Sequence, residues 1–394
     1  MVAPTALPTQ NPKTRLKREP QRREARPPFG ALYANHDIKK TKSSVITFCK
    51  AAGGRFDSDS ATITQQPQIQ NIMIIDNLSN EDYHRGEDYR RYISSTQLKH
   101  YAVSPAYARR KMAEPDEQTP AQTFGSLVHA AMEHIARHGS LDDFADRVAV
   151  FCAPINAKTG AAYTPASKAY TDAYGAFLAA NAGKIIASTD DLVVALNIAG
   201  NIVVSLSDTA KQARYALSTG RPEVSILLDV DGVGFKVRPD LLCDGMILDY
   251  KTTASLSLSE IDGAIRRYHY DISAAMYQWA VHEETGKWCS FYWLFLAKEP
   301  PFDAVMVKAD YFAYLYDPVS DDVLKGPGAV AFEALRQLHI DCTKANKWPG
   351  AETYIPRAAD GSRIIDAQPP MWYVTQIDNK YNHIANIGDD TAGI

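Results

Sequence analysis

The segment "VRPDLLCDGMILDYKTT", Val237 to Thr253, carries charged side chains in a run that is otherwise apolar enough to lie inside a sheet. Side chains two residues apart in a strand share a face, so Asp249 and Lys251 would point the same way. Asp240 closes the strand before them, and a short connection, Leu241 to Gly245, leads from one strand to the next. If the two strands are neighbours, we expect Asp240 and Asp249 to lie close together.

Two carboxylates at close range predict a site for a divalent cation. Without a cation they repel and raise one another's pKa, and two oxygen donors beside a lysine suit Mg²⁺, with Mn²⁺ as a substitute. Such an ion acidifies a bound water and neutralises charge on a phosphoryl oxygen, while Lys251 can orient the water. The pattern therefore indicates phosphodiester cleavage. The alternative is a solvent-facing Asp249–Lys251 pair, which the apolar neighbours Ile247 and Leu248 disfavour.

The flanking sequence indicates an α/β core that follows a helical region. We expect strands at residues 223–230, 233–240, 246–252, 289–297 and 303–309. The Asp231-Gly232 pair predicts a hairpin turn between the first two strands. Helices are expected in the core at 257–284 and 328–346, and before the core at 93–113 with a break at Ser104-Pro105, at 123–139, and twice within 165–218.

The bulk composition is that of an ordinary soluble protein. The chain has 394 residues, of which 45% are apolar and 22% charged, and its formal net charge is -4. No apolar run approaches the ~20 residues that span a bilayer, and the start lacks the apolar stretch of a secretory signal. We expect a cytoplasmic protein with no membrane partner. The five cysteines are scattered, so we expect isolated, buried thiols and no zinc site, disulfide framework or iron–sulfur cluster.

The quoted segment resembles the active-site hairpin of the PD-(D/E)XK nuclease superfamily. Arg238-Pro239-Asp240 stands for the PD, and Asp249-Tyr250-Lys251 for the D-x-K. Four further stretches resemble the nuclease domain of the exodeoxyribonuclease VIII (RecE) family. They are "YHRGEDYRRYISSTQLKHYAVSPAYARRK", "FGSLVHAAMEH", "WPG" at 348–350 and "PPMWY" at 369–373. The likeness covers about residues 80–375. It implies a restriction-endonuclease-like α/β core, a mixed central sheet flanked by helices, with a helical N-terminal preface.

The resemblance implies a metal site with one more member. A histidine on the early helix joins the site in that family, and the matching residue is His129. It would bind the ion with Asp240, Asp249 and the Tyr250 carbonyl, while Lys251 positions the attacking water. A buried structural histidine is the alternative for His129. Gly125, one turn earlier, would let the helix approach the sheet closely.

Several other residues are candidates by resemblance or by type. Glu223 resembles a further acidic residue near the metal, and is otherwise a charge at a strand edge. Related nucleases carry a Q-x-x-x-Y after the D-x-K strand; here Ser273 stands four residues before Tyr277, where those have glutamine. Both would share one helix face. Tyr277 is otherwise a half-buried aromatic residue.

Three basic side chains are candidates for DNA binding. Lys236 could contact a phosphate or be an exposed strand residue. Arg266 and Arg267 precede three aromatic rings, in the sequence "RRYHY". Arginine contacts to phosphate and stacking of a tyrosine on a base fit that cluster. An exposed helix end whose arginines extend into water is the alternative.

The resemblance also implies a domain layout. We expect one nuclease domain at 71–375, with its helical preface at 90–218 and its catalytic sheet core at 219–346, and a C-terminal tail at 376–394. Residues 1–70 have the composition of a disordered tail, in which Lys13 to Arg26 holds seven basic residues against two glutamates. A basic arm that touches DNA is the alternative for this tail.

The activity that the resemblance implies is a Mg²⁺-dependent DNA exonuclease. It would digest linear double-stranded DNA from 5′ to 3′ and leave 3′ single strands for recombination. Such enzymes are often phage-encoded, act beside a RecT-like single-strand annealing protein, and form ring-shaped tetramers. The alternatives are another nuclease of the superfamily (an endonuclease or a Cas4-like enzyme), a catalytically silent DNA-binding protein with this fold, or an unrelated α/β protein with a chance motif.

Overall fold

The structure is a computed structural model that describes residues 68–114 and 119–354, together with positions 361, 362, 369, 371, 374 and 375. The basic stretch Lys13 to Arg26, Cys49 and the expected C-terminal tail at 376–394 lie outside the described residues. Nearly all of the expected tail at 1–70 lies outside them too.

Four strands form the first sheet, in the order β1-β6-β7-β2. Their bounds are Ile69–Ile75 for β1, Ser225–Val230 for β6, Val233–Val237 for β7 and Tyr92–Ile93 for β2. The expected hairpin is confirmed, because β6 and β7 pair antiparallel up to Val230 and Val233. Asp231 and Gly232 between them have φ of 52° and 80°, and two positive φ values are typical of a two-residue hairpin turn.

Five strands form the second sheet, in the order β11-β10-β9-β8-β5. Their bounds are Ala304–Lys308 for β11, Ser290–Ala297 for β10, Met246–Thr253 for β9, Leu241–Cys243 for β8 and Arg221–Pro222 for β5. β9 is parallel to β10 and antiparallel to β8, so the sheet is mixed, as the expected fold class requires. The expectation that Leu241 to Gly245 is only a connection was wrong, because Leu241–Cys243 form the strand β8. A three-residue strand is too short to show a period of two.

Residues 165–218 contain three helices where two were expected. The helices before the core are α2 Asn80–Arg85, α3 Ser95–Lys99, α4 Pro105–Ala113, α5 Pro120–His138, α6 Lys168–Ala180, α7 Thr189–Val204 and α8 Asp208–Thr219. Ser167, Ser188 and Ser207 each cap one of the last three by accepting a backbone N–H. These serines were the signal for three separate helix starts. The break at Ser104-Pro105 is confirmed, since Ser104 caps α4.

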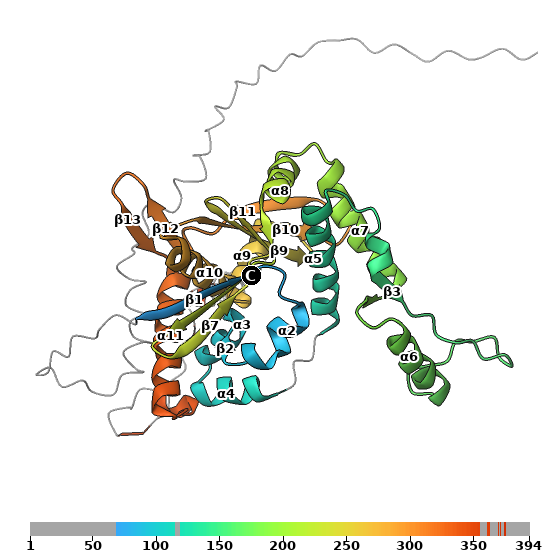
Figure 1. Cartoon of the computed structure of the whole chain (residues 1–394), viewed down its shortest axis with the longest axis horizontal. Helices are drawn as coiled ribbons and strands as arrows, with labels where there is room; N and C mark the ends of the chain where they lie inside the picture. Colours follow the sequence, from blue (N-terminus) through green and yellow to red (C-terminus); the bar gives the residue numbers. More distant parts are fainter. Residues whose placement is uncertain are drawn as a thin grey trace, which may run out of the picture. The chain divides into compact units, whose positions relative to one another are not determined.

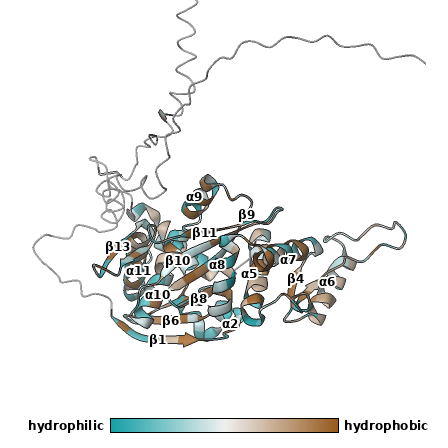
Figure 2. Cartoon of the chain, turned by 90° about the horizontal axis from the view of Figure 1, so that it is seen from above, coloured by the Kyte–Doolittle hydropathy of each residue, from teal (hydrophilic) through white to brown (hydrophobic). Residues whose placement is uncertain are grey.

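The single helix expected at 257–284 is two helices. α9 spans Leu258–Arg267 and α10 spans Tyr270–Thr285. The chain breaks because His269 adopts φ 50°, a left-handed conformation that a continuous helix cannot contain. Figure 2 shows apolar and polar residues alternating around α9. Ile261 and Ile265 of α9 are buried, whereas its last turn is exposed.

The remaining elements lie outside the two main sheets. They are α11 Pro327–Ala345, the parallel pair β3 Val148–Val150 and β4 Ile185–Ala187, the hairpin β12 Tyr314–Asp317 and β13 Asp322–Lys325, and the 3-10 turns Glu87–Tyr89, His100–Ala102, Phe144–Arg147 and Ala351–Tyr354.

Helices cover both faces of the second sheet. Along β9 and β10 the buried side chains alternate: Ile247 and Trp293 belong to one core with α9, α10 and α11, whereas Leu248 and Leu294 belong to another with α5, α7 and α8. Figure 1 shows α5 and α10 on either side of these strands. The preface helices α5, α7 and α8 therefore pack directly on the second sheet.

Within residues 68–114 and 119–354, no single helix is long and apolar enough to cross a membrane. The helices α7 and α8 reach the length and apolar composition of a membrane span only when they are counted as one segment, and the chain bends by 94° between them. Both helices contribute buried residues to the core described above. The four described cysteines, Cys152, Cys243, Cys289 and Cys342, are free thiols. Cys289 and Cys342 are buried as expected, but Cys243 is only partly buried, and the expectation was wrong for Cys152, which is exposed.

Candidate active site

The two aspartates of the quoted segment face one another across β8 and β9. Leu241 pairs with Leu248 in the antiparallel register, so one residue further Asp240 lies opposite Asp249. The backbone N–H of Tyr250 donates to Oδ2 of Asp240 at 2.5 Å. Both aspartates are buried. The expected approach therefore comes from the short strand β8, because β7 belongs to the other sheet.

Lys251 lies on the same face of β9 as Asp249 and forms an ion pair with it. Its Nζ also donates to the Tyr250 carbonyl at 3.2 Å. Burial opposes the charge of Lys251, but the Asp249 and Asp240 carboxylates outweigh burial and raise the pKa of this lysine. Burial also raises the pKa of Asp249. The solvent-facing pair that was the alternative is not what the structure has.

His129 reaches this pair from α5. Its Nδ1 lies 3.1 Å from Oδ1 of Asp240, and its ring meets the Tyr250 ring edge-on at 5.5 Å between centroids. Burial works against a charge on both partners. Their mutual attraction outweighs it, so the pKa of His129 is raised and the pKa of Asp240 is lowered. His129 thus contacts an acidic group of the site, which a purely structural core histidine would not need.

The start and end of α5 explain how it holds His129 in place. Thr119 and Gln122 form a capping box at its start, and Gly139 with φ 78° ends it. Gly125 contributes less than expected. A Cβ at that position would meet Thr252 Oγ1 at 3.8 Å, an ordinary contact, so the helix does not need glycine there to approach the sheet.

Glu223 lies beside Asp240, between β5 and β6. Its backbone N–H donates to the Asp240 carbonyl at 3.2 Å, and its own φ is 55°. Burial, together with the charge of Asp240, raises the pKa of Glu223 to about 8. Glu223 is therefore part of the acidic cluster and not an isolated charge at a strand edge.

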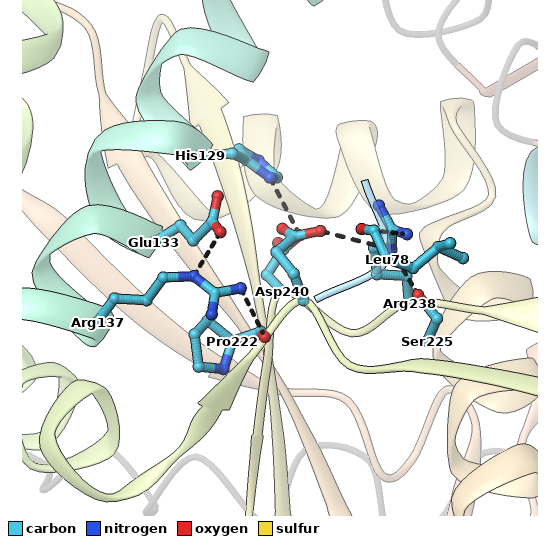
Figure 3. Close-up of polar contacts among 9 residues, drawn as sticks. Leu78, His129, Glu133, Arg137, Pro222, Ser225, Arg238 and Asp240 are labelled. Carbon is cyan, nitrogen blue, oxygen red and sulfur yellow. Dashed lines mark hydrogen bonds and ion pairs between the residues drawn. The ribbon is translucent and has the colours of Figure 1, made fainter. Parts of the chain in front are cut away.

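Two further side chains of α5 face the same region and were missed. Figure 3 shows His129, Glu133 and Arg137 in a row on α5, directed toward Asp240 and Pro222. Arg137 pairs with Glu133 at 2.7 Å and donates to Asn77 Oδ1 at 2.8 Å. Glu133 and Arg137 follow His129 at successive intervals of four residues, and this spacing was the available signal.

The structure places Lys236 away from solvent, contrary to the expectation of a phosphate contact. It is buried, and its Nζ donates to the carbonyls of Tyr83 and Tyr89. Its neighbour Arg238 lies over the Tyr83 ring at 3.9 Å and donates to the Leu78 carbonyl at 3.1 Å. These two cations hold the α2 segment on the first sheet. A buried amine beside two carbonyls has no need of a phosphate.

Ser273 and Tyr277 share the inner face of α10. Ser273 Oγ donates to Ser95 Oγ at 3.2 Å, and Ser95 is also a hydrogen-bond partner of Tyr277. Burial, with the nearby charges of Tyr83, Asp249 and Asp240, raises the pKa of Tyr277 well above its ordinary value. Tyr277 therefore borders the acidic cluster, whereas Ser273 is directed to α3.

Arg266 and Arg267 form the exposed last turn of α9. The Arg267 guanidinium lies 5.9 Å from the centre of the Tyr268 ring. Lys99, at the end of α3, donates to the Tyr268 carbonyl at 3.1 Å. Lys99 was not among the residues expected at the site. The fold brings it there, because α3 lies next to the start of α10.

The donors of this site fit a hard divalent cation by their chemistry. They comprise two carboxylates, one imidazole and the Tyr250 carbonyl, and oxygen donors with an occasional imidazole suit Mg²⁺ or Mn²⁺. Burial raises the pKa of Asp249 and of Glu223, and a nearby cation would favour the charged form of both acids. In the described residues no three His, Cys, Asp or Glu side chains are already arranged around one metal position. Asp249 is instead engaged with Lys251, and Asp240 with His129.

We compared the chain with protein families, curated proteins and solved structures. Residues 94–317 match the family described as a PDDEXK-like domain of unknown function (DUF3799), and that range contains every residue of the acidic site. No curated protein matches the chain significantly. A crystal structure of a candidate exonuclease from Eubacterium rectale is similar at 19% sequence identity and a TM-score of 0.44, over 76% of this chain and 98% of that one.

Proposed function

This chain belongs to the family of PDDEXK-like domains of unknown function (DUF3799), and we propose that it is a metal-dependent nuclease that hydrolyses phosphodiester bonds of DNA. One observation carries the proposal. Asp240 and Asp249 are opposed across β8 and β9, and Lys251 projects from the same face as Asp249. Two buried carboxylates and a lysine at one point of a sheet cost folding free energy, which suits a functional site better than a structural one.

Each residue has a distinct proposed role. Asp240, Asp249, His129 and the Tyr250 carbonyl hold the ion, with Glu223 as a further acidic neighbour. A bound divalent ion supplies positive charge that acidifies water and neutralises the phosphoryl oxygens. Lys251 orients the attacking water and stabilises the negative charge that develops on the phosphoryl group. Hydrolysis forms one P–O bond from water and breaks the bond to the leaving sugar oxygen, which takes up a proton.

The finer proposal is an exonuclease of linear duplex DNA with 5′ to 3′ polarity, leaving 3′ strands for recombination beside a RecT-like annealing protein. The motif set that resembles the exodeoxyribonuclease VIII family supports it, together with the position of those motifs. The serines of "YISSTQLK" cap and begin α3, and "FGSLVHAAMEH" lies within α5. His129 of α5 contacts Asp240, and Lys99 of α3 lies near Asp249. A homo-oligomer belongs to the same proposal.

Digestion of a linear duplex labelled at one 5′ end tests both the nuclease proposal and the finer exonuclease proposal. Wild type, Asp249→Ala and Lys251→Ala are incubated with Mg²⁺, Mn²⁺ or EDTA, and a closed circle serves as the control substrate. Early release of the label as short products, only with metal and only by wild type, supports the exonuclease. Lys344→Ala is the matched lysine control, because Lys344 is half exposed and pairs with Asp231 in another region.

The other outcomes discriminate among the alternatives. Cleavage of the closed circle would favour an endonuclease. Activity that survives both substitutions would place the active site elsewhere. DNA binding without any cleavage would favour a silent protein with this fold.

A further inference from the structure

The junction of α9 and α10 places a pair of aromatic rings beside the Lys251 ammonium. Tyr268 ends α9, and Tyr270 begins α10 after the turn at His269. The rings of Tyr268 and Tyr270 stack, with centroids 5.5 Å apart and 29° between their planes. Lys251 Nζ lies 4.9 Å from the centre of the Tyr270 ring, and Tyr268 is 52% exposed. The pair therefore leads from the acidic site to the surface.

A second lysine approaches the same ring pair from α3. Lys99 Nζ lies 5.9 Å from the centre of the Tyr270 ring and donates to the Tyr268 carbonyl. Within the described residues, no carboxylate lies at ion-pair distance from Lys99. Burial, with the neighbouring Lys251 ammonium, lowers the pKa of Lys99 to about 7. Asp249 and Asp271 attract the Lys99 charge, but burial and the Lys251 ammonium outweigh them. A partly buried amine next to another cation, with no carboxylate at ion-pair distance, is a place where an anion would bind favourably.

This combination of groups matches one chemical class of ligand. An open tyrosine face stacks on a nucleobase of any sequence, and a neighbouring cation contacts its phosphate. The Arg267 guanidinium lies 5.9 Å from the centre of the Tyr268 ring and is a further cation beside the ring pair. Inside a duplex both faces of a base are covered by its neighbours in the stack. An unpaired base is therefore the kind that can lie on Tyr268.

We propose that Tyr268, Tyr270 and Lys99 form a subsite for one unpaired nucleotide next to the cleaved phosphodiester. Tyr268 stacks on the base, Tyr270 supports it from beneath, and Lys99 contacts the phosphate. This proposal rests on the proposed nuclease function and extends it, because it requires the bound strand to be separated from its complement at the site.

Binding without cleavage tests the stacking first. The full chain is titrated in EDTA with a single-stranded oligonucleotide that carries the fluorescent base 2-aminopurine. Tyr268→Ala is expected to weaken binding roughly tenfold and to remove the fluorescence quenching that stacking causes. Tyr268→Phe keeps the ring and should bind as wild type does. Tyr311→Ala is the matched control, because Tyr311 is 81% exposed at another position.

The salt dependence tests the phosphate contact separately. Lys99→Met should lower the slope of log affinity against log salt by about one, the loss of a single phosphate contact. Lys99→Arg should restore it, and Tyr268→Ala should leave the slope unchanged. Melting temperatures of all variants identify any that are unfolded, and the Tyr268 series decides the proposal if Lys99→Met is among them.

Cleavage assays then distinguish the subsite proposal from the nuclease proposal on which it rests. With Mg²⁺, wild type should degrade a duplex with a mismatched end faster than a fully paired one, and Tyr268→Ala should lose this preference. If wild type cuts no DNA, the nuclease proposal fails, while the EDTA titration still decides the subsite. If wild type cuts DNA but Tyr268→Ala and Lys99→Met bind single strands as it does, the subsite proposal is overturned.

Discussion

The backbone N–H of Tyr250 donates to Oδ2 of Asp240, and this bond orients the other oxygen of the same carboxylate, which lies 3.1 Å from His129 Nδ1. One aspartate thus links β9 to α5. The side chain of Asp240 is held by the backbone on one side and by an imidazole on the other. A change at this position should affect the site more than the fold, provided that the hydrogen bond to Tyr250 survives.

Asp240→Asn keeps an oxygen that can accept from Tyr250 but removes the negative charge. Changes in groups that only support a metal ligand cost 10–100-fold, so loss of a ligand should lower the cleavage rate at least about 100-fold. Mn²⁺ binding, measured by calorimetry, should weaken as well. Asp244→Asn, in the exposed turn after β8, is the matched control. Unchanged Mn²⁺ affinity in Asp240→Asn would remove Asp240 from the site.

Lys251→Met should separate chemistry from ion binding. Lys251 forms an ion pair with Asp249 and would compete with an ion for that carboxylate, so its loss should leave Mn²⁺ affinity equal to that of wild type or higher. The cleavage rate should fall by a factor of about 10²–10⁴, the usual contribution of a group that moves or orients a proton. Single-turnover cleavage at saturating Mn²⁺ measures this. A variant that regains the wild-type rate at high Mn²⁺ would show that Lys251 acts only through the ion.

His339 predicts how stability responds to acid. Its Nδ1 accepts from the Tyr101 hydroxyl at 2.7 Å, and burial lowers its pKa from 6.5 to about 4. The unfolded chain therefore takes up a proton as pH falls through 6.5, whereas the folded chain does so only near pH 4. Stability is lost on acidification between these values, by about 2 kcal/mol from pH 7 to pH 5.

Urea unfolding at the two pH values measures this effect. His339→Gln cannot titrate, so its loss of stability from pH 7 to pH 5 should be smaller than that of wild type by about 2 kcal/mol. Tyr101→Phe should keep most of the pH dependence while losing about 1 kcal/mol at pH 7, the net contribution of one hydrogen bond. An equal pH dependence in wild type and His339→Gln would contradict the assignment.

Lys236→Met tests the structural role that replaces the expected phosphate contact. It leaves the Tyr83 and Tyr89 carbonyls without their donor, which should cost roughly 1–3 kcal/mol of stability. The salt slope of DNA binding should not change. The exposed pair gives the contrast: Arg266→Ala with Arg267→Ala should lower that slope by up to about two with little effect on stability. A reduced slope in Lys236→Met would reinstate the phosphate contact.

The local pattern was sufficient for much of the fold. The alternation of β6 and β7 around Asp231-Gly232 predicted their hairpin, and Ser104-Pro105 predicted the start of α4. These signals are short in range, so each can be recognised within a few residues. The break at His269 could not be recognised in this way. Histidine favours neither a left-handed backbone nor a helix end strongly enough to predict a helix break.

Within one segment, a period of two predicted that Asp249 and Lys251 share a face, and the end of the preceding strand added Asp240. The family resemblance added His129 as a fourth candidate. Which residues surround these four depends on how distant segments pack. Lys236 is buried because the chain before β2 folds over it and accepts its hydrogen bond. Lys99 lies near the candidate site because α3 contacts the start of α10. Burial and contact between distant segments arise from packing the whole chain, and no pattern within one segment contains that information.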